Sequence, residues 1–467
     1  MNVEKDQTRE QPEEFPSRET GGLRGQKPRI GFLLIGHPDY PNDVGRTMLR
    51  SASEGLRKLG CEPVVQRQPL LSRAAARAAA EALIEEHPDG VVVFLGTWIE
   101  APVAFAAIRE IEHLPLAVWG FPQYVDRSGN LDSTGSLVAL TVVKATLERM
   151  GFSFTWIAGL PGDQDAVEKA ARFARVAMTL RALRHSALGL IGYASMGMYP
   201  GTFDHASLRR WIGPEVIHVD TSTLLRRMEG LPAEEGEKAI REMRKTAAFE
   251  EGVPPGLLEK AGRMTAALES LARDEELDAI DLKCQYELSQ EFGCTGCVAL
   301  SSLADKGLVC GCEGDVPTTV TQMILSLLSG KVTMYGDLLD WDENGNVLIS
   351  PCGFAPFSLC ADSPTLRRHT HPGFRGLLTS SVLKKGTITL ARLGETAEGY
   401  RLQVLVGKTV PTELRQGIFP AIKLNIRESR AEIIQGMTSQ HFALCYGSLR
   451  SDLRELCRWL NLEYVGR

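Results

Sequence analysis

The feature that most constrains the fold is an alternation of short apolar runs with helical patterns, which begins at Pro28. The first apolar run, Ile30–Ile35, is followed by a helical pattern over about 43–59. Another helical pattern, Ala-rich, spans 72–86 and precedes the apolar run Gly90–Leu95. This repetition is typical of βα units that build a parallel sheet. We therefore predict flavodoxin-like layers in the first half of the chain.

The pattern changes further along the chain. It is helical with charged faces over about 232–275 and returns to a strand at Ala279–Lys283. After Asn346, period-two runs such as Thr387–Arg392 are separated by Gly- and Pro-containing turns, which indicates antiparallel strands. The predicted fold class is α/β: two Rossmann- or flavodoxin-like parallel α/β domains followed by a β-rich antiparallel C-terminal domain. The predicted divisions are a disordered tail (1–27), two α/β domains (28–184 and 185–345) and the β-rich domain (346–467).

Composition excludes several classes of protein. The 467 residues are 43% hydrophobic and 24% charged, as in an ordinary globular enzyme. A formal charge of -6, without a long Lys/Arg tract, argues against nucleic acid as a partner. There is neither a secretory signal nor an uninterrupted run of about 18 apolar residues. We therefore expect a soluble, cytoplasmic protein with no membrane partner.

Four cysteines lie close together in the sequence. Cys294 and Cys297 form a C-x2-C pair, whereas Cys310 and Cys312 are separated by one residue. A zinc knuckle is one interpretation, but the second spacing is too short and the apolar segment between the pairs is helical in pattern. We favour reduced thiols buried around a strand end, as is usual in a chain without a secretory signal.

Two acidic residues flank a predicted helix in the segment that carries most chemical information. Pro317 suits the first turn of this helix, apolar residues recur at helical spacing over 320–328, and Gly330 suits its end. Both flanks are predicted strands of one parallel sheet. Glu313 and Asp337 would then follow adjacent strands at the same sheet edge, where such folds place their sites.

Two converging carboxylates repel each other unless a cation lies between them or one of them is protonated. Oxygen ligands suit Mn2+ or Mg2+, and an added imidazole favours Mn2+ over Mg2+ or another divalent cation. The alternative is that each acid only caps a helix, and Asp315 is well placed to do so. Capping does not explain Glu313 and Asp337 together, so we predict that both bind a metal.

The run Cys312–Val316, the step of 24 residues from 313 to 337 and the order of the domains resemble the L-fucose isomerase and L-arabinose isomerase superfamily. The resemblance covers essentially the whole chain after the tail. It implies that Glu313 and Asp337 bind Mn2+ and act as the acid/base pair, and that His441 completes the metal ligands. It also implies homotrimers or homohexamers with shared sites, in which Arg46 contacts sugar bound by a neighbouring subunit.

The predicted activity is that of a metal-dependent aldose–ketose isomerase of a free sugar. The metal would chelate two adjacent sugar oxygens while a proton moves between neighbouring carbons through an enediol. We assign Glu313 as the principal base and Asp337 as its partner acid/base. Lys283, at the end of its strand, is predicted to lie on the same edge and contact the sugar. No Walker or G-x-G-x-x-G motif predicts a nucleotide.

One departure from the superfamily keeps alternatives open. Relatives have a His where this chain has Pro351, before Cys352-Gly353, and proline cannot ligate a metal. His369 and His371 are candidates to replace it, although H-x-H in a loop is more often a surface feature. The alternatives are an epimerase or lyase with the same metal enediolate chemistry, or a sugar-binding protein without catalysis. The sequence leaves the identity of the sugar open, including any acidic or sulfonated group.

Overall fold

The computed structural model describes residues 22–467, which form two compact units. The smaller unit comprises 27–182 and 451–460, and the larger comprises 22–26, 183–450 and 461–467. Most of the predicted tail (1–27) lies outside the described residues, but its end, Gly22–Gly25, forms the short helix α1 with Leu23 buried. Across the described residues, no helix is long and apolar enough to cross a membrane.

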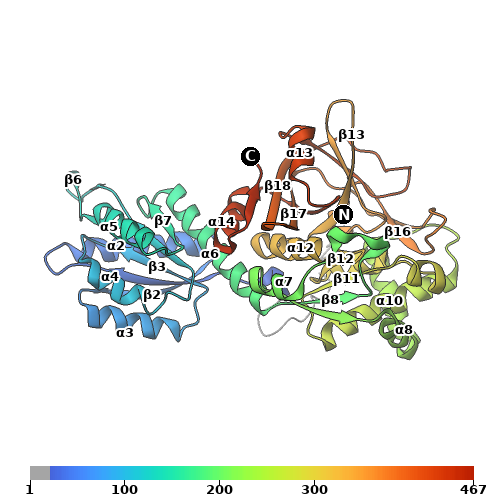
Figure 1. Ribbon diagram of the computed structural model, residues 1–467, viewed down its shortest axis with the longest axis horizontal. Coiled ribbons are helices and arrows are strands. Elements are labelled where there is room, and N and C mark those ends of the chain that lie inside the picture. The colour runs from blue at the N-terminus through green and yellow to red at the C-terminus, as the bar shows by residue number, and fades with distance from the viewer. Residues whose placement is uncertain (1–21) are drawn as a thin grey trace, which may run out of the picture. The chain divides into compact units, whose positions relative to one another are not determined.

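The smaller unit is built on a five-stranded parallel sheet (Figure 1). Its strand order, β2-β1-β3-β4-β7, is the flavodoxin-like order 2-1-3-4-5. Helices α3, α4 and α5 share a buried core with one face, and α2 and α6 share another core with the opposite face. The elements are β1 (Arg29–Ile35), α2 (Asn42–Lys58), β2 (Glu62–Leu70), α3 (Arg73–Ile84), β3 (Gly90–Leu95), α4 (Ala101–Ile108), β4 (Leu116–Gly120), β5 (Tyr124–Val125), β6 (Leu131–Asp132), α5 (Ser136–Arg149), β7 (Thr155–Ala158), α6 (Gln164–His185) and α14 (Arg450–Leu460).

The larger unit begins with a second parallel sheet, of four strands in the order β12-β11-β8-β9. Strands β8, β11 and β12 are almost wholly buried, as expected when helices cover both faces of a parallel sheet. The elements are β8 (Ala187–Ile191), α7 (His205–Trp211), β9 (Glu215–Val219), α8 (Thr221–Gly230), α9 (Ala233–Thr246), α10 (Pro255–Asp274), β11 (Ala279–Leu282), α11 (Cys297–Asp305), β12 (Val309–Cys312) and α12 (Val316–Ser329).

An antiparallel sheet follows in the same unit, so two parallel sheets and a β-rich region are present as predicted. The pairing of β17 with β18 closes six strands into a ring, in the order β17-β20-β13-β14-β19-β18. Strand β21 adds to β18 in parallel. The elements are β13 (Met334–Trp341), β14 (Val347–Ser350), β17 (Thr387–Thr396), β18 (Gly399–Val410), β19 (Ile422–Ile426), α13 (Arg430–Gly436), β20 (His441–Tyr446) and β21 (Glu463–Val465), beside a small sheet of β10 (Ala248–Phe249), β15 (Thr365–Arg368) and β16 (Leu377–Ser380).

The structure corrects the predicted position of Asp337. Its strand, β13, does not continue the parallel sheet of β12 but lies between β14 and β20, antiparallel to both. The reason is the tight turn after β13, where the Asp342 carboxylate accepts hydrogen bonds from the backbone N–H groups of Asn344 and Asn346. This turn pairs β13 directly with β14 as a hairpin, whereas the right-handed crossover rule applies only to parallel strands of one sheet.

Candidate active site

Glu313 stands on a strained turn at the carboxyl end of β12. Its backbone N–H donates to the Leu282 carbonyl of β11 at 3.1 Å, and its φ of 70° lies in the left-handed region. The next residue, Gly314, has a φ of 67°, and a Cβ there would lie 2.3 Å from the Tyr193 carbonyl oxygen. Only glycine fits this position. Strain of this kind at a non-glycine residue persists where the surroundings over-determine it, as they often do at functional sites.

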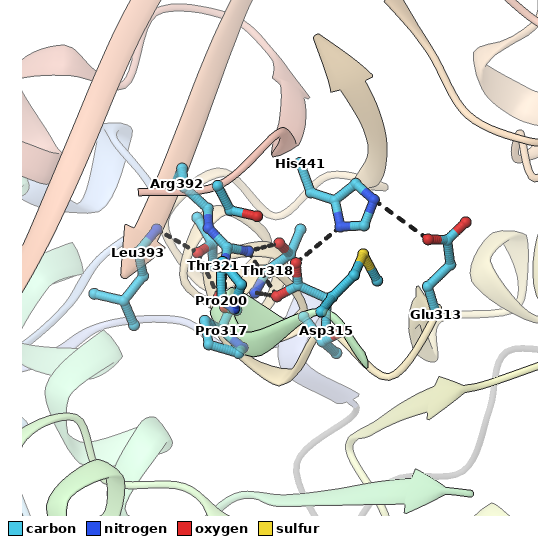
Figure 2. A network of polar contacts seen from close by, with 12 residues as sticks. Pro200, Glu313, Asp315, Pro317, Thr318, Thr321, Arg392, Leu393 and His441 are labelled. Atoms are coloured by element: carbon cyan, nitrogen blue, oxygen red, sulfur yellow. Dashed lines mark hydrogen bonds and ion pairs between the residues drawn. The ribbon is translucent and has the colours of Figure 1, made fainter. Parts of the chain in front are cut away.

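Asp337 and His441 reach the same place from the antiparallel sheet. They are directly paired on β13 and β20, so their side chains lie on one face of the sheet. His441 Nε2 lies 3.3 Å from Asp337 Oδ1 and 3.5 Å from Glu313 Oε2 (Figure 2 shows the contact with Glu313). The structure therefore brings together the three residues predicted as metal ligands, although by a different topology from the one predicted.

The opposite nitrogen of the His441 ring is fixed by a buried carboxylate. His441 Nδ1 lies 2.8 Å from Asp315 Oδ2, and the other oxygen of Asp315 accepts from Arg392 Nη1 at 2.6 Å (Figure 2). Asp315 also caps α12, as predicted, by accepting from the Thr318 backbone N–H at 3.0 Å. An Nδ1–H held in this way leaves Nε2 as the nitrogen that faces Glu313 and Asp337.

Burial and charge shift the pKa values of these groups in opposite directions. Burial raises the pKa of Glu313 to about 7. Burial would also raise the pKa of Asp315, but Arg392 and His441 hold it below its usual value. Burial alone would lower the pKa of His441, yet hydrogen bonds to the three surrounding carboxylates raise it well above its usual value. The site therefore favours a positive charge between Glu313 and Asp337.

Asp281 stabilises the turn at Glu313 and Gly314 through hydrogen bonds. This role was not predicted from the sequence. Its side chain is fully buried in β11, accepts from the Gly314 backbone N–H at 3.0 Å and accepts from Thr319 Oγ1 at 2.8 Å. Burial raises the pKa of Asp281 to about 8. An acid inside an apolar strand pattern was the available signal, because a buried carboxyl needs such partners.

The donor set fits a divalent metal by its chemistry. Two carboxylates and an imidazole nitrogen are suitable ligands for Mn2+, and the Asp315–His441 hydrogen bond is the usual support of a histidine ligand. Among the described residues, however, no group of three His, Cys, Asp or Glu side chains is already arranged to hold a metal ion. Metal binding by Glu313, Asp337 and His441 would require these side chains to draw closer together than they are here.

The other two predicted sugar contacts lie in different surroundings. Lys283 directly follows β11 beside Glu313, but its Nζ is paired with Glu287 Oε2 at 2.5 Å. Arg46 is near the start of α2, in the smaller unit, and pairs with Asp43. Contact of either residue with a sugar stays a prediction.

His369 does not take the place of the missing histidine ligand. Its Nε2 lies 2.9 Å from the Cys352 carbonyl oxygen, and its Nδ1 accepts from the His371 backbone N–H at 3.3 Å. Both ring nitrogens are therefore engaged by the backbone, which leaves neither for a metal. Pro351 stands at the end of β14, where its carbonyl accepts from Arg415 Nη2 at 3.3 Å.

The predicted thiols are buried, as expected. Cys294, Cys297, Cys310 and Cys312 are all buried, and none of them forms a disulfide within the part of the chain described. Cys352 lies close enough to the Cys312 thiol and to the Glu313 carboxyl to shift the pKa of each. The predicted burial of these four thiols is confirmed.

Comparison with known proteins reveals relatives over nearly the whole chain. The chain is 24% identical to a sulfoquinovose isomerase from Priestia aryabhattai over 448 residues, 94% of this chain and 99% of the relative. It is also 24% identical to a sulfoquinovose isomerase from Alkalicoccus urumqiensis, over 82% of this chain and 87% of that one. No protein-family model matches the sequence. These relatives support the prediction that the chain is an isomerase, an intramolecular oxidoreductase.

A likeness to solved structures is weak. A periplasmic solute-binding protein of an ABC transporter from Actinobacillus succinogenes, with bound D-allose, is 13% identical with a TM-score of 0.17. The match covers 55% of this chain and 78% of the solute-binding protein. A match at this level carries no argument about fold or function.

Proposed function

We propose that this chain is a metal-dependent aldose–ketose isomerase that acts on a free sugar through an enediol intermediate. One observation carries the proposal: Glu313 and Asp337 converge on His441 Nε2, while Asp315 holds the other ring nitrogen. A carboxylate pair around a site for positive charge is suited to moving a proton next to a polarised carbonyl group. The isomerase relatives give the reaction class.

Glu313, Asp337 and His441 would hold the metal, with Mn2+ as the expected ion and Mg2+ or another divalent cation as the alternative. A bound metal would polarise two adjacent oxygens of an open-chain sugar and stabilise the negative charge that develops on them. Glu313 is the proposed base, because a carboxyl with a pKa of about 7 takes and returns a proton near neutral pH. It removes a proton from the carbon next to the carbonyl and gives it to the carbonyl oxygen, which yields the enediol. Asp337 takes the proton of the hydroxyl that becomes the new carbonyl and delivers it to the neighbouring carbon.

The relatives also indicate which sugar to test first. Sulfoquinovose, the sugar in their name, carries a sulfonate group in addition to the aldehyde and hydroxyl that isomerise. We propose a sulfonated sugar as the substrate. The proposed assembly is a homotrimer or homohexamer, which sedimentation of the purified protein would test.

The proposal is tested by proton exchange at the reacting carbon. Protein loaded with Mn2+ is incubated with sulfoquinovose in deuterated water, and the products are followed by NMR. The expected result is a ketose with deuterium at the carbon next to the carbonyl, and loss of this activity on removal of the metal. An epimer or a cleavage product would replace the isomerase with the corresponding alternative, and absence of exchange with every sugar tested would overturn the proposal.

A further inference from the structure

Arg415 is a cation near the candidate site that forms no ion pair with a carboxylate of residues 22–467. Among the described residues, no carboxylate lies within ion-pairing distance of its guanidinium, whereas Lys283 is paired with Glu287 and Arg392 with Asp315. Burial lowers the pKa of Arg415, and Asp337 and Cys352 lie close enough to oppose this. A partly buried guanidinium without a counter-ion is costly unless an anion binds it.

The position of Arg415 is fixed relative to the site by its hydrogen bonds. Its Nε donates to Ser350 Oγ at 2.9 Å and its Nη2 donates to the Pro351 carbonyl at 3.3 Å. Ser350 is the residue paired with Asp337 across β13 and β14. Cys352, the residue after Pro351, lies close enough to the Glu313 carboxyl to shift its pKa. Arg415 is thus hydrogen-bonded to residues 350 and 351. This short segment begins beside Asp337 and ends near Glu313, the two proposed acid/base residues.

The guanidinium is held in place but not saturated. It stacks over the buried Phe419 ring, with 4.1 Å between its carbon and the ring centroid. An arginine has five N–H groups, and within the described part of the chain two of them have partners, which leaves three for a ligand. The side chain of Asp337 is 24% exposed and that of Glu313 only 8%, so the site is more open on the Asp337 side.

We propose that Arg415 binds the anionic substituent of the substrate, a sulfonate or a similar oxyanion, and thereby selects charged over neutral sugars. A planar fork of N–H donors matches such an oxyanion with two parallel hydrogen bonds. His369, whose ring nitrogens are both engaged by the backbone, lines this region without supplying a charge. The proposal rests on the proposed isomerase function for the location of the reacting carbons.

The test compares two sugars that differ only in the anionic group. Sulfoquinovose and glucose are titrated into the Mn2+-loaded full chain by calorimetry, and turnover of each is measured separately. Arg415→Met is expected to weaken sulfoquinovose binding and kcat/KM by roughly 100-fold, the effect of removing one partner of a desolvated charge pair. The constants for glucose should change less than about threefold, and Arg415→Lys should restore part of the preference.

A matched control is Arg401→Met, because Arg401 lies in β18 of the same ring of strands but is paired with Glu463. This variant should leave both sugars unaffected. Equal losses for both sugars in Arg415→Met would mean that Arg415 only supports residues 350–352, and an unchanged preference would also overturn the inference. If the sulfonated sugar binds through Arg415 but exchanges no proton, the isomerase proposal fails while this inference stands. If the wild-type protein isomerises sugars but shows no preference for sulfoquinovose over glucose, this inference fails while the isomerase proposal stands.

Discussion

His441 lies directly opposite Asp337 on the neighbouring antiparallel strand, with its Nε2 3.3 Å from Asp337 Oδ1. The backbone hydrogen bonds between β13 and β20 set this contact. They therefore fix the position of His441, a proposed metal ligand, relative to Asp337. Glu313 reaches the same nitrogen from a separate parallel sheet. The candidate site therefore lies where the two kinds of sheet meet within one compact unit.

Glu313→Gln should strongly reduce isomerisation and deuterium exchange. The amide keeps the shape of the side chain but cannot accept the proton, so we expect a loss of roughly 100- to 10,000-fold in kcat. Thermal unfolding should change little. Glu269→Gln, which removes a carboxylate paired with Lys306 elsewhere in the same unit, serves as the control. Full activity in the Glu313 variant would refute its role as the base.

Asp315→Asn should weaken metal binding, although it replaces none of the proposed metal ligands. The variant removes the charge that fixes His441 Nδ1, and changes of this kind reduce metal affinity by roughly 10- to 100-fold. It also leaves the buried Arg392 without its counter-ion, which should lower the free energy of unfolding by about 3–5 kcal/mol. Calorimetric titration with Mn2+ and chemical denaturation measure the two effects. The control Asp274→Asn, at an exposed pair with Arg227, should change neither.

Metal affinity should fall as the pH falls below about 7. Glu313, with a pKa of about 7, and His441, with a pKa raised above its usual value, must each release a proton before they bind a metal. Protonation competes below those values, so the Mn2+ dissociation constant should rise about tenfold per pH unit for each proton displaced. Titrations at pH 6, 7 and 8 measure the slope, which Glu313→Gln should reduce by one proton. A flat profile would contradict the proposed ligand set.

Gly314→Ala should destabilise the protein and disturb the site. The left-handed φ of 67° costs an alanine about 1–2 kcal/mol, and the contact of its Cβ with the Tyr193 carbonyl adds about 1–3 kcal/mol. Gly252→Ala isolates the first term, because Gly252 has a φ of 74° and nothing within 4 Å of a built Cβ. Equal losses of unfolding free energy in the two variants would show that the close approach at Gly314 is relieved without cost.

Local patterns predicted the helices and strands well, because they depend on neighbours in the sequence. The expected helix after Pro317 is α12, and Gly330 ends it with a φ of 66°. The prediction that β13 joins the parallel sheet beside β12 was wrong. The Asn344-Gly345 turn signal for a hairpin with β14 is nevertheless present in the sequence. The local pattern is compatible with either a hairpin or a crossover connection at this point, and β13 forms the hairpin with β14 instead of joining the parallel sheet.

Two residues near the site, Arg392 and Arg415, could not be predicted from the sequence. Arg392 reaches Asp315 across a separation of 77 residues, from the middle of a strand that closes the ring. Nothing in a single sequence indicates that an arginine there is fully buried rather than exposed. The position of Arg415 near the site could not be predicted for the same reason, because its hydrogen-bond partners, Ser350 and Pro351, lie far away along the chain.

The division of the chain into units has a consequence for biosynthesis. Neither unit is one continuous stretch: the smaller receives α14 only from residues 451–460, and β21 of the larger follows it. The buried side chains of α14, among them Leu453 and Leu456, leave the ribosome about 270 residues after the rest of the smaller unit. Each unit therefore stays incomplete until residues 451–467 have been synthesised, and a truncation that removes these residues would impair both units.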